Sequence, residues 1–346
     1  MKIRNMAVLA ALMLGCLACT PGAGNTRQGA PALEEEDNKP VVKQEKAIDS
    51  SGSYIITDYD EHGNELKKSF YDKNGKLTVV YTSTYDENLN LLTEVRTDSE
   101  GNVENYEKYV YDRDGNLIEE YEGDNEKELV IQNRYEYKSG KLVKDIFYGL
   151  DENDIFWINV YEYNDKGLLV KKSHESEDGY VYRTYEYEYD KNDNLIKMTD
   201  MSYGKCPHIY FYDSEERVIK EEYYGEDGEL SFATENKYGK YGLEESITTG
   251  RIPSHTVIEY KNNGQTVTTY SVAEDGTKKE TRVKTYDKDG NLLHSYSPKD
   301  ALLGYSEFEA EYNEYGLPVK THSFCNEAFR DIGPVDETTE FEYIYY

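Results

Sequence analysis

Tyrosine and acidic residues alternate along many short segments of this chain. Residues 185–189 read Tyr-Glu-Tyr-Glu-Tyr, and residues 161–163 read Tyr-Glu-Tyr. Alternate residues of a β-strand share one face of the sheet. The alternation therefore predicts strands that carry tyrosines on one face and acids on the other, with tyrosine stacked over tyrosine in successive repeats. Lysines that follow in the next strands predict cross-strand pairs with these acids, at Lys144, Lys171 or Lys172, Lys197 and Lys220.

A seven-residue motif separates these strands, with its clearest copy, YDRDGNL, at residues 111–117. Asp112 can accept a backbone hydrogen bond from two residues on, and Gly115 can take the left-handed conformation that closes a hairpin. In two copies, at residues 85–91 and 189–195, Leu89 and Asp193 replace this glycine. Because an asparagine follows each of them and tolerates positive φ, we expect these two turns to be shifted or strained.

The motif recurs at a fixed distance. Its first tyrosines, Tyr59, Tyr85, Tyr111, Tyr137, Tyr163 and Tyr189, are 26 residues apart (85 − 59 = 26). A weaker turn signal lies halfway between them, for example DSEG at residues 98–101. Each repeat of about 26 residues therefore predicts two strands. The expected fold is all-β: an antiparallel β-meander repeat array that forms an elongated twisted or coiled sheet.

The chain divides by composition into three parts. Residues 53–346 carry the repeats, and residues 340–346 (EFEYIYY) predict a closing strand that caps the array. Residues 19–52 lack periodicity and are rich in Pro, Gly, Ala, Glu, Lys and Ser, which is typical of a flexible tether. Residues 1–18 combine a basic start with a short apolar stretch, as in a secretory signal peptide.

The end of this signal resembles a bacterial lipoprotein signal, because a small residue precedes a cysteine in Ala18-Cys19 and again in Gly15-Cys16. The resemblance implies lipidation of Cys19, or alternatively Cys16, with acyl chains such as palmitate. It also implies export, with attachment to the cell envelope through the lipid alone and a position outside the cytoplasm. Two alternatives remain: cleavage without lipidation, and a Cys16-x-x-Cys19 redox or metal motif.

Composition restricts the partners. The 346 residues carry 39 Lys and Arg against 69 Asp and Glu, for a net charge of −30. Such a surface repels phosphate backbones, so we expect no nucleic-acid binding. Hydrophobic residues make up only 37% of the chain, too few for a thick core, and the 36 tyrosines supply part of the missing apolar surface.

The recurring YDxxGNL motif resembles the YD repeat of the Rhs family over most of residues 59–317. Long members of that family wind strips of β-hairpins into a shell, and many enclose a C-terminal toxin. This chain is much shorter and ends in repeat sequence. The resemblance therefore favours a shorter sheet or an open coil over a closed, toxin-holding shell.

No catalytic, cofactor or metal site is predicted. The six histidines are dispersed along the array without a zinc-type spacing, and we interpret them as solvated turn or strand residues. Asp112, Asp114 and Asn116 have the spacing of a calcium loop, but the glycine required at its sixth position is Leu117 here. Turn formation explains these residues better.

The tyrosines have two interpretations: packing on the buried side of a thin sheet, or a platform on which ligands stack. The candidate ligand-binding residues are Trp157, Tyr161, Tyr163, Tyr185 and Tyr187. The sequence favours a non-enzymatic cell-surface lipoprotein, a repeat scaffold that binds an extracellular protein or polymer. One alternative is a carbohydrate-binding surface module that uses exposed tyrosines. Another is a hydrolase with a cryptic acidic site.

Overall fold

The described residues of the repeat region form antiparallel strands joined by turns. The computed structural model describes residues 40–149, 154–202, 204–261, 264–298, 305–325 and 335–346. The chain divides into units Met1–Leu33 and Glu34–Tyr346, and the first unit lies outside the described residues. The described part contains no helix of the length and apolar character needed to cross a lipid bilayer. Its 24 strands are β1 (Val42–Asp49), β2 (Tyr54–Tyr59), β3 (Glu65–Tyr71), β4 (Leu77–Tyr85), β5 (Leu91–Asp98), β6 (Val103–Tyr111), β7 (Leu117–Gly123), β8 (Leu129–Lys138), β9 (Lys141–Tyr148), β10 (Ile155–Tyr163), β11 (Leu169–Glu175), β12 (Val181–Tyr189), β13 (Leu195–Asp200), β14 (Cys206–Tyr212), β15 (Val218–Tyr224), β16 (Leu230–Gly239), β17 (Gly242–Gly250), β18 (Ser254–Lys261), β19 (Gly264–Val272), β20 (Lys278–Tyr286), β21 (Leu292–Ser297), β22 (Ser306–Tyr312), β23 (Pro318–Cys325) and β24 (Val335–Tyr345).

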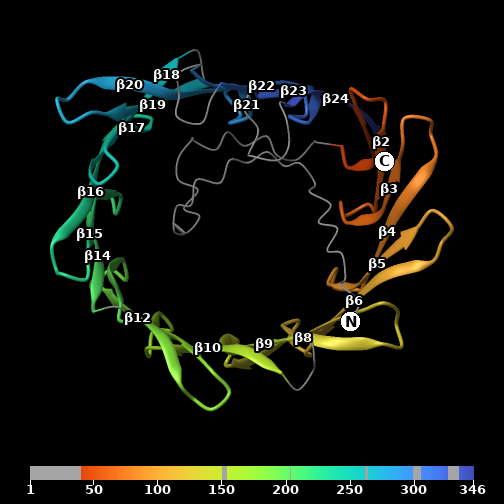
Figure 1. Ribbon diagram of the computed structural model, residues 1–346, viewed down its shortest axis with the longest axis horizontal. Coiled ribbons are helices and arrows are strands. Elements are labelled where there is room, and N and C mark those ends of the chain that lie inside the picture. Colours follow the sequence, from red (N-terminus) through yellow and green to blue (C-terminus); the bar gives the residue numbers. More distant parts are fainter. Residues whose placement is uncertain (1–39, 150–153, 203, 262–263, 299–304, 326–334) are drawn as a thin grey trace, which may run out of the picture. The chain divides into compact units, whose positions relative to one another are not determined.

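The predicted meander and its period are confirmed. Strands β4, β6, β8, β10 and β12 begin at residues 77, 103, 129, 155 and 181, in steps of 26. Each strand pairs antiparallel with the strands next to it in sequence, as Figure 1 shows around the ring of strands. The two strands per repeat therefore follow from the two turn signals per repeat.

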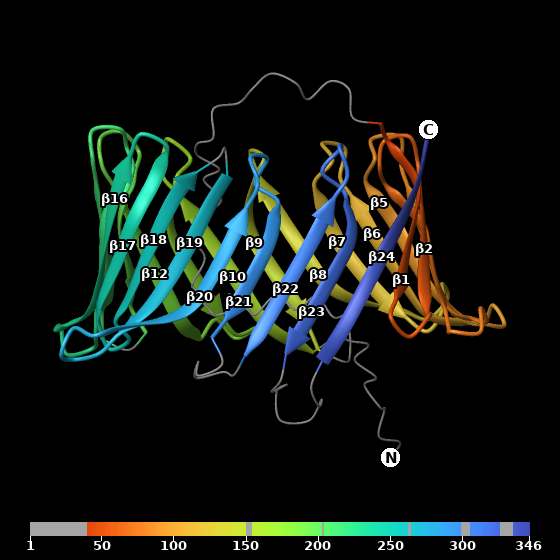
Figure 2. The same cartoon turned by 90° about the horizontal axis from the view of Figure 1, so that it is seen from above.

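The expectation of an open, elongated sheet is wrong, because the sheet closes on itself into a barrel. β1 pairs antiparallel with β24 from Val42 opposite Tyr345 to Asp49 opposite Thr339. Figure 2 shows these two strands side by side. An open sheet would leave one edge of β1 and one edge of β24 without hydrogen-bond partners, and closure satisfies both. The predicted closing strand at residues 340–346 thus lies mostly in β24, which caps the array by pairing with its first strand.

Strand β1 also corrects the predicted tether. Residues 42–49, which composition places in the flexible segment 19–52, form a strand paired on both sides. Lys46 lies opposite Ile56 of β2 and opposite Glu342 of β24. The segment carries no turn motif or tyrosine alternation of its own, so its strand character depends on these two neighbours.

The turns form as their sequence predicts. In the clearest copy, Asp112 Oδ1 accepts hydrogen bonds from the backbone N–H groups of Asp114 and Asn116, both at 2.9 Å. Asn116 Nδ2 donates to Asp112 Oδ2 at 3.0 Å, so both carboxylate oxygens serve the turn. Gly115 takes φ of +83°. These contacts confirm turn formation as the role of the calcium-like spacing.

The outgoing strand of most hairpins carries one extra residue near its start. Tyr163 pairs with Leu169, whereas Glu162 pairs with Lys171, so Val170 is the extra residue. The same shift recurs at the opposite end of the strands, where Tyr182 is the extra residue between Val181 and Arg183. Such bulges bend a sheet and increase its twist, which favours closure.

In several repeats, the tyrosine that opens the motif connects neighbouring hairpins. Its hydroxyl donates to a backbone carbonyl at the start of the preceding strand, as from Tyr189 to Leu169 (2.7 Å) and from Tyr163 to Leu142 (2.8 Å). The same bond recurs at Tyr85, Tyr212, Tyr238, Tyr260 and Tyr312, and Tyr343 of β24 makes an equivalent bond without opening a motif. These hydroxyls therefore link one turn to the next along one rim of the strands.

Little of the sheet is fully buried. Among the described residues, the buried apolar side chains are Val80, Ile131, Ile146, Ile158, Ala233, Val283 and Ala310. The predicted lysine–glutamate pairs are present, including Lys197 with Glu188 at 2.7 Å and Lys171 with Glu162 at 3.0 Å. Hydrogen bonds and cross-strand pairs thus replace much of the packing that a second layer would supply.

Candidate functional site

The five predicted ligand-binding residues lie on two strands. Trp157, Tyr161 and Tyr163 belong to β10, and Tyr185 and Tyr187 belong to β12, with β11 between them. Tyr161 and Tyr185 both lie opposite Lys172. The prediction that tyrosines of successive repeats stack on one another is therefore wrong here, because β11, with Lys172 between the two tyrosines, separates the two tyrosine-bearing strands.

The tyrosines of this set are half-buried and engaged within the sheet. The Tyr161 hydroxyl donates to Asp145 Oδ2 at 2.7 Å, and Asp145 also accepts from Asn159 Nδ2 at 2.5 Å. Burial raises the pKa of Tyr163 and Tyr187 above the ordinary phenol value. These contacts favour the packing interpretation for the tyrosine ladder, and its role in ligand binding stays a prediction.

A group of more exposed aromatic side chains lies at the opposite end of the same strands. Trp157 is 37% exposed, and its ring centroid lies 4.9 Å from that of Phe147 and 4.5 Å from that of Phe156. Phe156, at 64% exposure, is the extra residue of the β10 bulge, since Ile155 and Trp157 pair with the consecutive residues Tyr148 and Phe147. The bulge therefore brings three aromatic rings together.

The next hairpin repeats this arrangement. Tyr180 and Tyr182 are 62% and 60% exposed, with ring centroids 5.0 Å apart. Tyr182 occupies the bulge position 26 residues after Phe156 (182 − 156 = 26), so the two side chains have equivalent places in the repeat. Ile158 of β10 and Val181 of β12 both pair with Glu175 of β11. Ile158 and Val181 are thus about 10 Å apart, twice the strand spacing.

We call Phe147, Phe156, Trp157, Tyr180 and Tyr182 the aromatic rim. Of these five residues, only Trp157 was predicted from the sequence. The sequence does carry a signal for Phe156 and Tyr182, because each is an aromatic residue at the second position of an outgoing strand in consecutive repeats. It could be used only once the bulge at that position was known.

The interpretation of all histidines as solvated is wrong for two of them. His208 and His255 are buried, and their Nε2 atoms lie 3.0 Å from Glu221 Oε2 and 2.7 Å from Glu245 Oε1. The Tyr223 ring stacks on the His208 ring at a centroid distance of 3.6 Å. Such histidine–carboxylate pairs join adjacent strands of the sheet.

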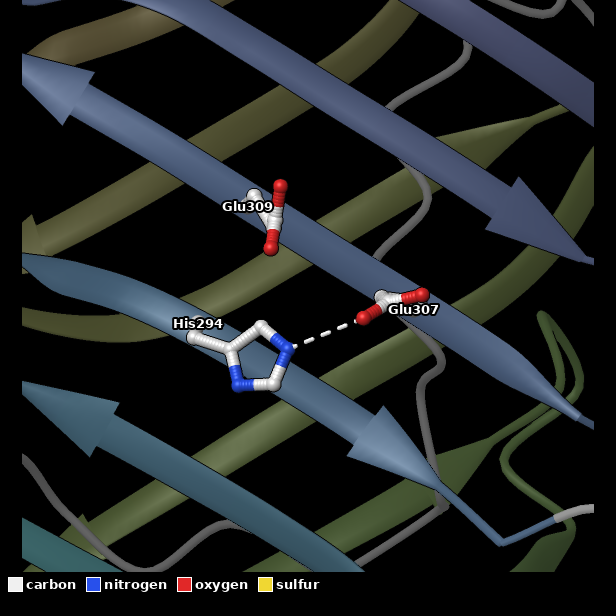
Figure 3. A group of neighbouring side chains, drawn as sticks. All are labelled: His294, Glu307 and Glu309. Carbon is white, nitrogen blue, oxygen red and sulfur yellow. Dashed lines mark hydrogen bonds and ion pairs between the residues drawn. The ribbon is translucent and has the colours of Figure 1, made fainter.

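The same kind of pair occurs twice near the end of the array. His294 Nε2 lies 3.2 Å from Glu307 Oε1, and His322 Nε2 lies 2.9 Å from Asp336 Oδ1. The partners in these pairs are 13 and 14 residues apart, the length of one strand and one turn. Figure 3 shows that Glu309 lies beside the first pair. His294, Glu307 and Glu309 are the residues of the described chain that could together hold a metal ion.

Two glutamates in the first five strands of the sheet have perturbed acidity. Burial raises the pKa of Glu45 in β1 and of Glu94 in β5 above the ordinary 4.5, and the charge of Lys68 opposes the shift at both. These are the half-buried acids that bear on the hydrolase alternative. Their environment contains further carboxylates, Glu65 near both and Glu107 near Glu94, which raise the pKa as well.

The predicted lipidation sites, Cys19 and the alternative Cys16, lie outside the described residues, as do the whole of the predicted signal peptide and residues 19–39 of the predicted tether. Lipidation, export and envelope attachment accordingly remain expectations drawn from the sequence.

The described residues define a class of fold, a closed barrel of antiparallel repeats. No protein-family model matches the chain, and no curated protein matches it. A solved TcdB2-TccC3 structure without its hypervariable C-terminal region is similar at 15% identity and a TM-score of 0.45, over 79% of this chain and 17% of that chain. A TcdB2-TccC3-Cdc42 structure is 14% identical with a TM-score of 0.46, over 83% of this chain and 17% of that chain.

A porin-like protein from Bacteroides uniformis is 11% identical with a TM-score of 0.24, over 88% of this chain and 100% of that chain. This chain spans about a sixth of the length of the two TcdB2-TccC3 chains, of which it covers 17%. Likenesses at this level assign no family, so the resemblance to the YD repeat rests on the sequence motif.

Proposed function

We propose that this protein is a non-enzymatic, YD-repeat lipoprotein of the cell surface whose repeat domain binds an extracellular protein or polymer through the aromatic rim. The observation that supports the proposal most directly is the exposure of Phe156 and Tyr182 at 64% and 60%. Large exposed aromatic groups mark binding surfaces, because burying each of them removes much apolar area from water.

The net charge of −30 belongs to the whole chain; it favours solubility and disfavours binding of acidic partners. The lipid anchor is proposed from the signal sequence and Cys19. It would hold the repeat domain outside the cytoplasm without requiring a membrane-spanning helix.

A carbohydrate ligand is the second candidate. Two pairs of exposed rings, Phe156 with Trp157 and Tyr180 with Tyr182, lie in consecutive hairpins, at the same end of β10 and β12. These two strands are two strand spacings, or about 10 Å, apart. Sugar rings stack on aromatic faces, and a linear glycan could contact both pairs at once. We therefore include glycans among the probes.

The single tryptophan of the chain makes the test direct, because Trp157 lies in the aromatic rim. The purified chain is screened against arrays of soluble polysaccharides and extracellular proteins, and each hit is titrated while Trp157 fluorescence is followed. We expect a shift or quenching of the emission that saturates with the ligand. The double variant Phe156→Ala, Tyr182→Ala should weaken binding at least tenfold, since each buried aromatic ring contributes more than about 1 kcal/mol.

Tyr241→Ala is the matched control. Tyr241 is 56% exposed but lies in the turn between β16 and β17, away from the aromatic rim, so its loss should leave binding unchanged. Hits that bind the double variant as tightly as the wild-type chain, with no change in Trp157 emission, would rule out the aromatic rim as the binding surface.

A further inference from the structure

Two strands near the end of the array bring a histidine and two glutamates to one place. In the antiparallel register, His294 of β21 lies opposite Glu309 of β22, and Glu307 precedes Glu309 by two residues on the same face. His322 of β23 lies opposite Glu309 on its other side. One nitrogen donor and two carboxylates therefore meet without any loop, on the sheet itself (Figure 3).

The spacing of these groups suits a tetrahedral metal ion. Ligands bound at about 2.0–2.2 Å to a tetrahedral ion lie about 3.4 Å from one another. His294 Nε2 and Glu307 Oε1 are 3.2 Å apart, and the three ligand atoms all lie within 4.8 Å of one another. Glu309 is exposed, so its side chain can close the remaining distance by a change of rotamer.

A neighbouring hydroxyl orients one of the carboxylates. The Tyr305 hydroxyl hydrogen-bonds Glu307 Oε2, which leaves Oε1 directed toward His294. Hydrogen bonds of this kind to a ligand carboxylate are the usual support of a metal site. The buried pair of His255 and Glu245 also has a histidine nitrogen next to a carboxylate oxygen, but in the described chain no third ligand residue lies close enough to form a comparable group.

The donor set selects the class of ion. Calcium and magnesium prefer shells made of oxygen, with six or more ligands for calcium. One imidazole with carboxylates suits zinc and the neighbouring divalent transition metals. We propose that His294, Glu307 and Glu309 bind a divalent transition-metal ion of the zinc type. This site is separate from the aromatic rim and does not depend on the proposed function.

The experiment uses the purified full chain, treated with a chelator and then desalted, in a background where Cys16, Cys19, Cys206 and Cys325 are replaced by serine. That background removes thiolates that would bind zinc on their own. Zinc sulfate is titrated by calorimetry, and bound metal is counted by mass spectrometry after gel filtration. We expect about one zinc ion per chain, and an affinity for calcium that is at least tenfold weaker.

The variants His294→Ala and Glu309→Gln should each weaken zinc binding at least tenfold. Glu309→Gln changes an exposed side chain, so its fold is retained even if His294→Ala proves unstable. His62→Ala is the matched control, because His62 lies 3.8 Å from Glu61 in an exposed turn elsewhere and should bind zinc as the parent does. No zinc binding by the parent, equal binding by Glu309→Gln, or equal affinities for calcium and zinc would each overturn the proposal.

Discussion

At the scale of single residues, one backbone position of the turn determines how well each repeat closes. It takes φ of +83° at Gly115 and +85° at Gly290. Where glycine is missing the turn is not shifted: Leu89 and Asp193 themselves take φ of +65° and +70°. These positive φ values agree with the expected strain in the two turns, because the left-handed conformation is unfavourable for a residue with a side chain.

The substitution Leu89→Gly should therefore stabilise the chain. It removes a left-handed conformation that costs a residue with a side chain about 1 kcal/mol or more. The expected result is a higher melting temperature, measured by circular dichroism. Gly115→Ala is the reciprocal change, and since a Cβ there meets nothing within 4 Å, it should lower the melting temperature through φ alone. A lower melting temperature for Leu89→Gly would contradict this account.

The sequence predicted side-chain contacts where both partners lie within a few residues of each other along the chain. The contacts of Asp112 span four residues, so their pattern is visible in the motif. The contacts of His208 and His294 reach a neighbouring strand 13 residues away, and they depend on register and on the bulges that shift it. Of the aromatic rim, only Trp157 was predicted, because the aromatic residues Phe156 and Tyr182 gain their meaning only from bulges that the motif does not reveal.

At the scale of elements, closure depends on the pairing of β1 with β24. The motif predicted the strands and their neighbours, since consecutive strands joined by short turns pair by default. It could not predict this last pair, because the two strands are not linked by a turn and β1 lacks the motif. The one general argument for closure was that an open sheet leaves the backbone groups of its two edge strands without hydrogen-bond partners.

A disulfide between the two strands tests closure directly. Lys46 and Glu342 lie opposite each other, with Nζ and Oε2 at 3.5 Å. With the natural cysteines replaced by serine, Lys46→Cys combined with Glu342→Cys should oxidise readily, because opposed residues in antiparallel strands lie within disulfide reach. A non-reduced digest analysed by mass spectrometry should contain the linked peptides.

The control combines Lys46→Cys with Glu235→Cys in β16, which should stay reduced. In an open sheet, β1 and β24 would be 23 strand spacings apart (24 − 1 = 23), or about 110 Å. Absence of the first crosslink under conditions that oxidise accessible thiols would mean that the sheet is open.

At the scale of the whole molecule, two groups of carboxylates make the stability of the fold depend on pH in opposite directions. In four turns, a side-chain hydrogen bond from the asparagine four residues on holds the pKa of the turn aspartate below 3.8; these aspartates are Asp60, Asp86, Asp98 and Asp112. At Asp72, the backbone N–H groups of Lys76 and Asn74 lower the pKa in the same way. The stability from these groups is present above pH 3.8 and is lost as the pH falls through their folded pKa values. Glu45 and Glu94 act in reverse: their contribution is present below pH 4.5 and is lost as the pH rises through their raised pKa values.

The melting temperature should therefore be highest at about pH 4–5 and fall on further acidification. Asp72→Asn tests the acidic side of this profile. Asn164 already occupies the equivalent place in another turn, where its Oδ1 accepts the N–H groups of Lys166 and Leu168 at 3.0 Å without titrating. The variant should lose less of its melting temperature between about pH 4 and pH 2 than the wild-type chain. An identical acidic limb in both proteins would show that the turn aspartates do not set it.

The bond between the last and the first strand has one more consequence. The backbone N–H of Tyr346 donates to the carbonyl of Val41 at 3.1 Å, so the two ends of the described strands are neighbours in space. A short linker could join them, and the polypeptide could then be cut at any one of its hairpins. Circular permutants of this kind should retain the same neighbour relations, and each of them would offer a different position for new termini or for a fused domain.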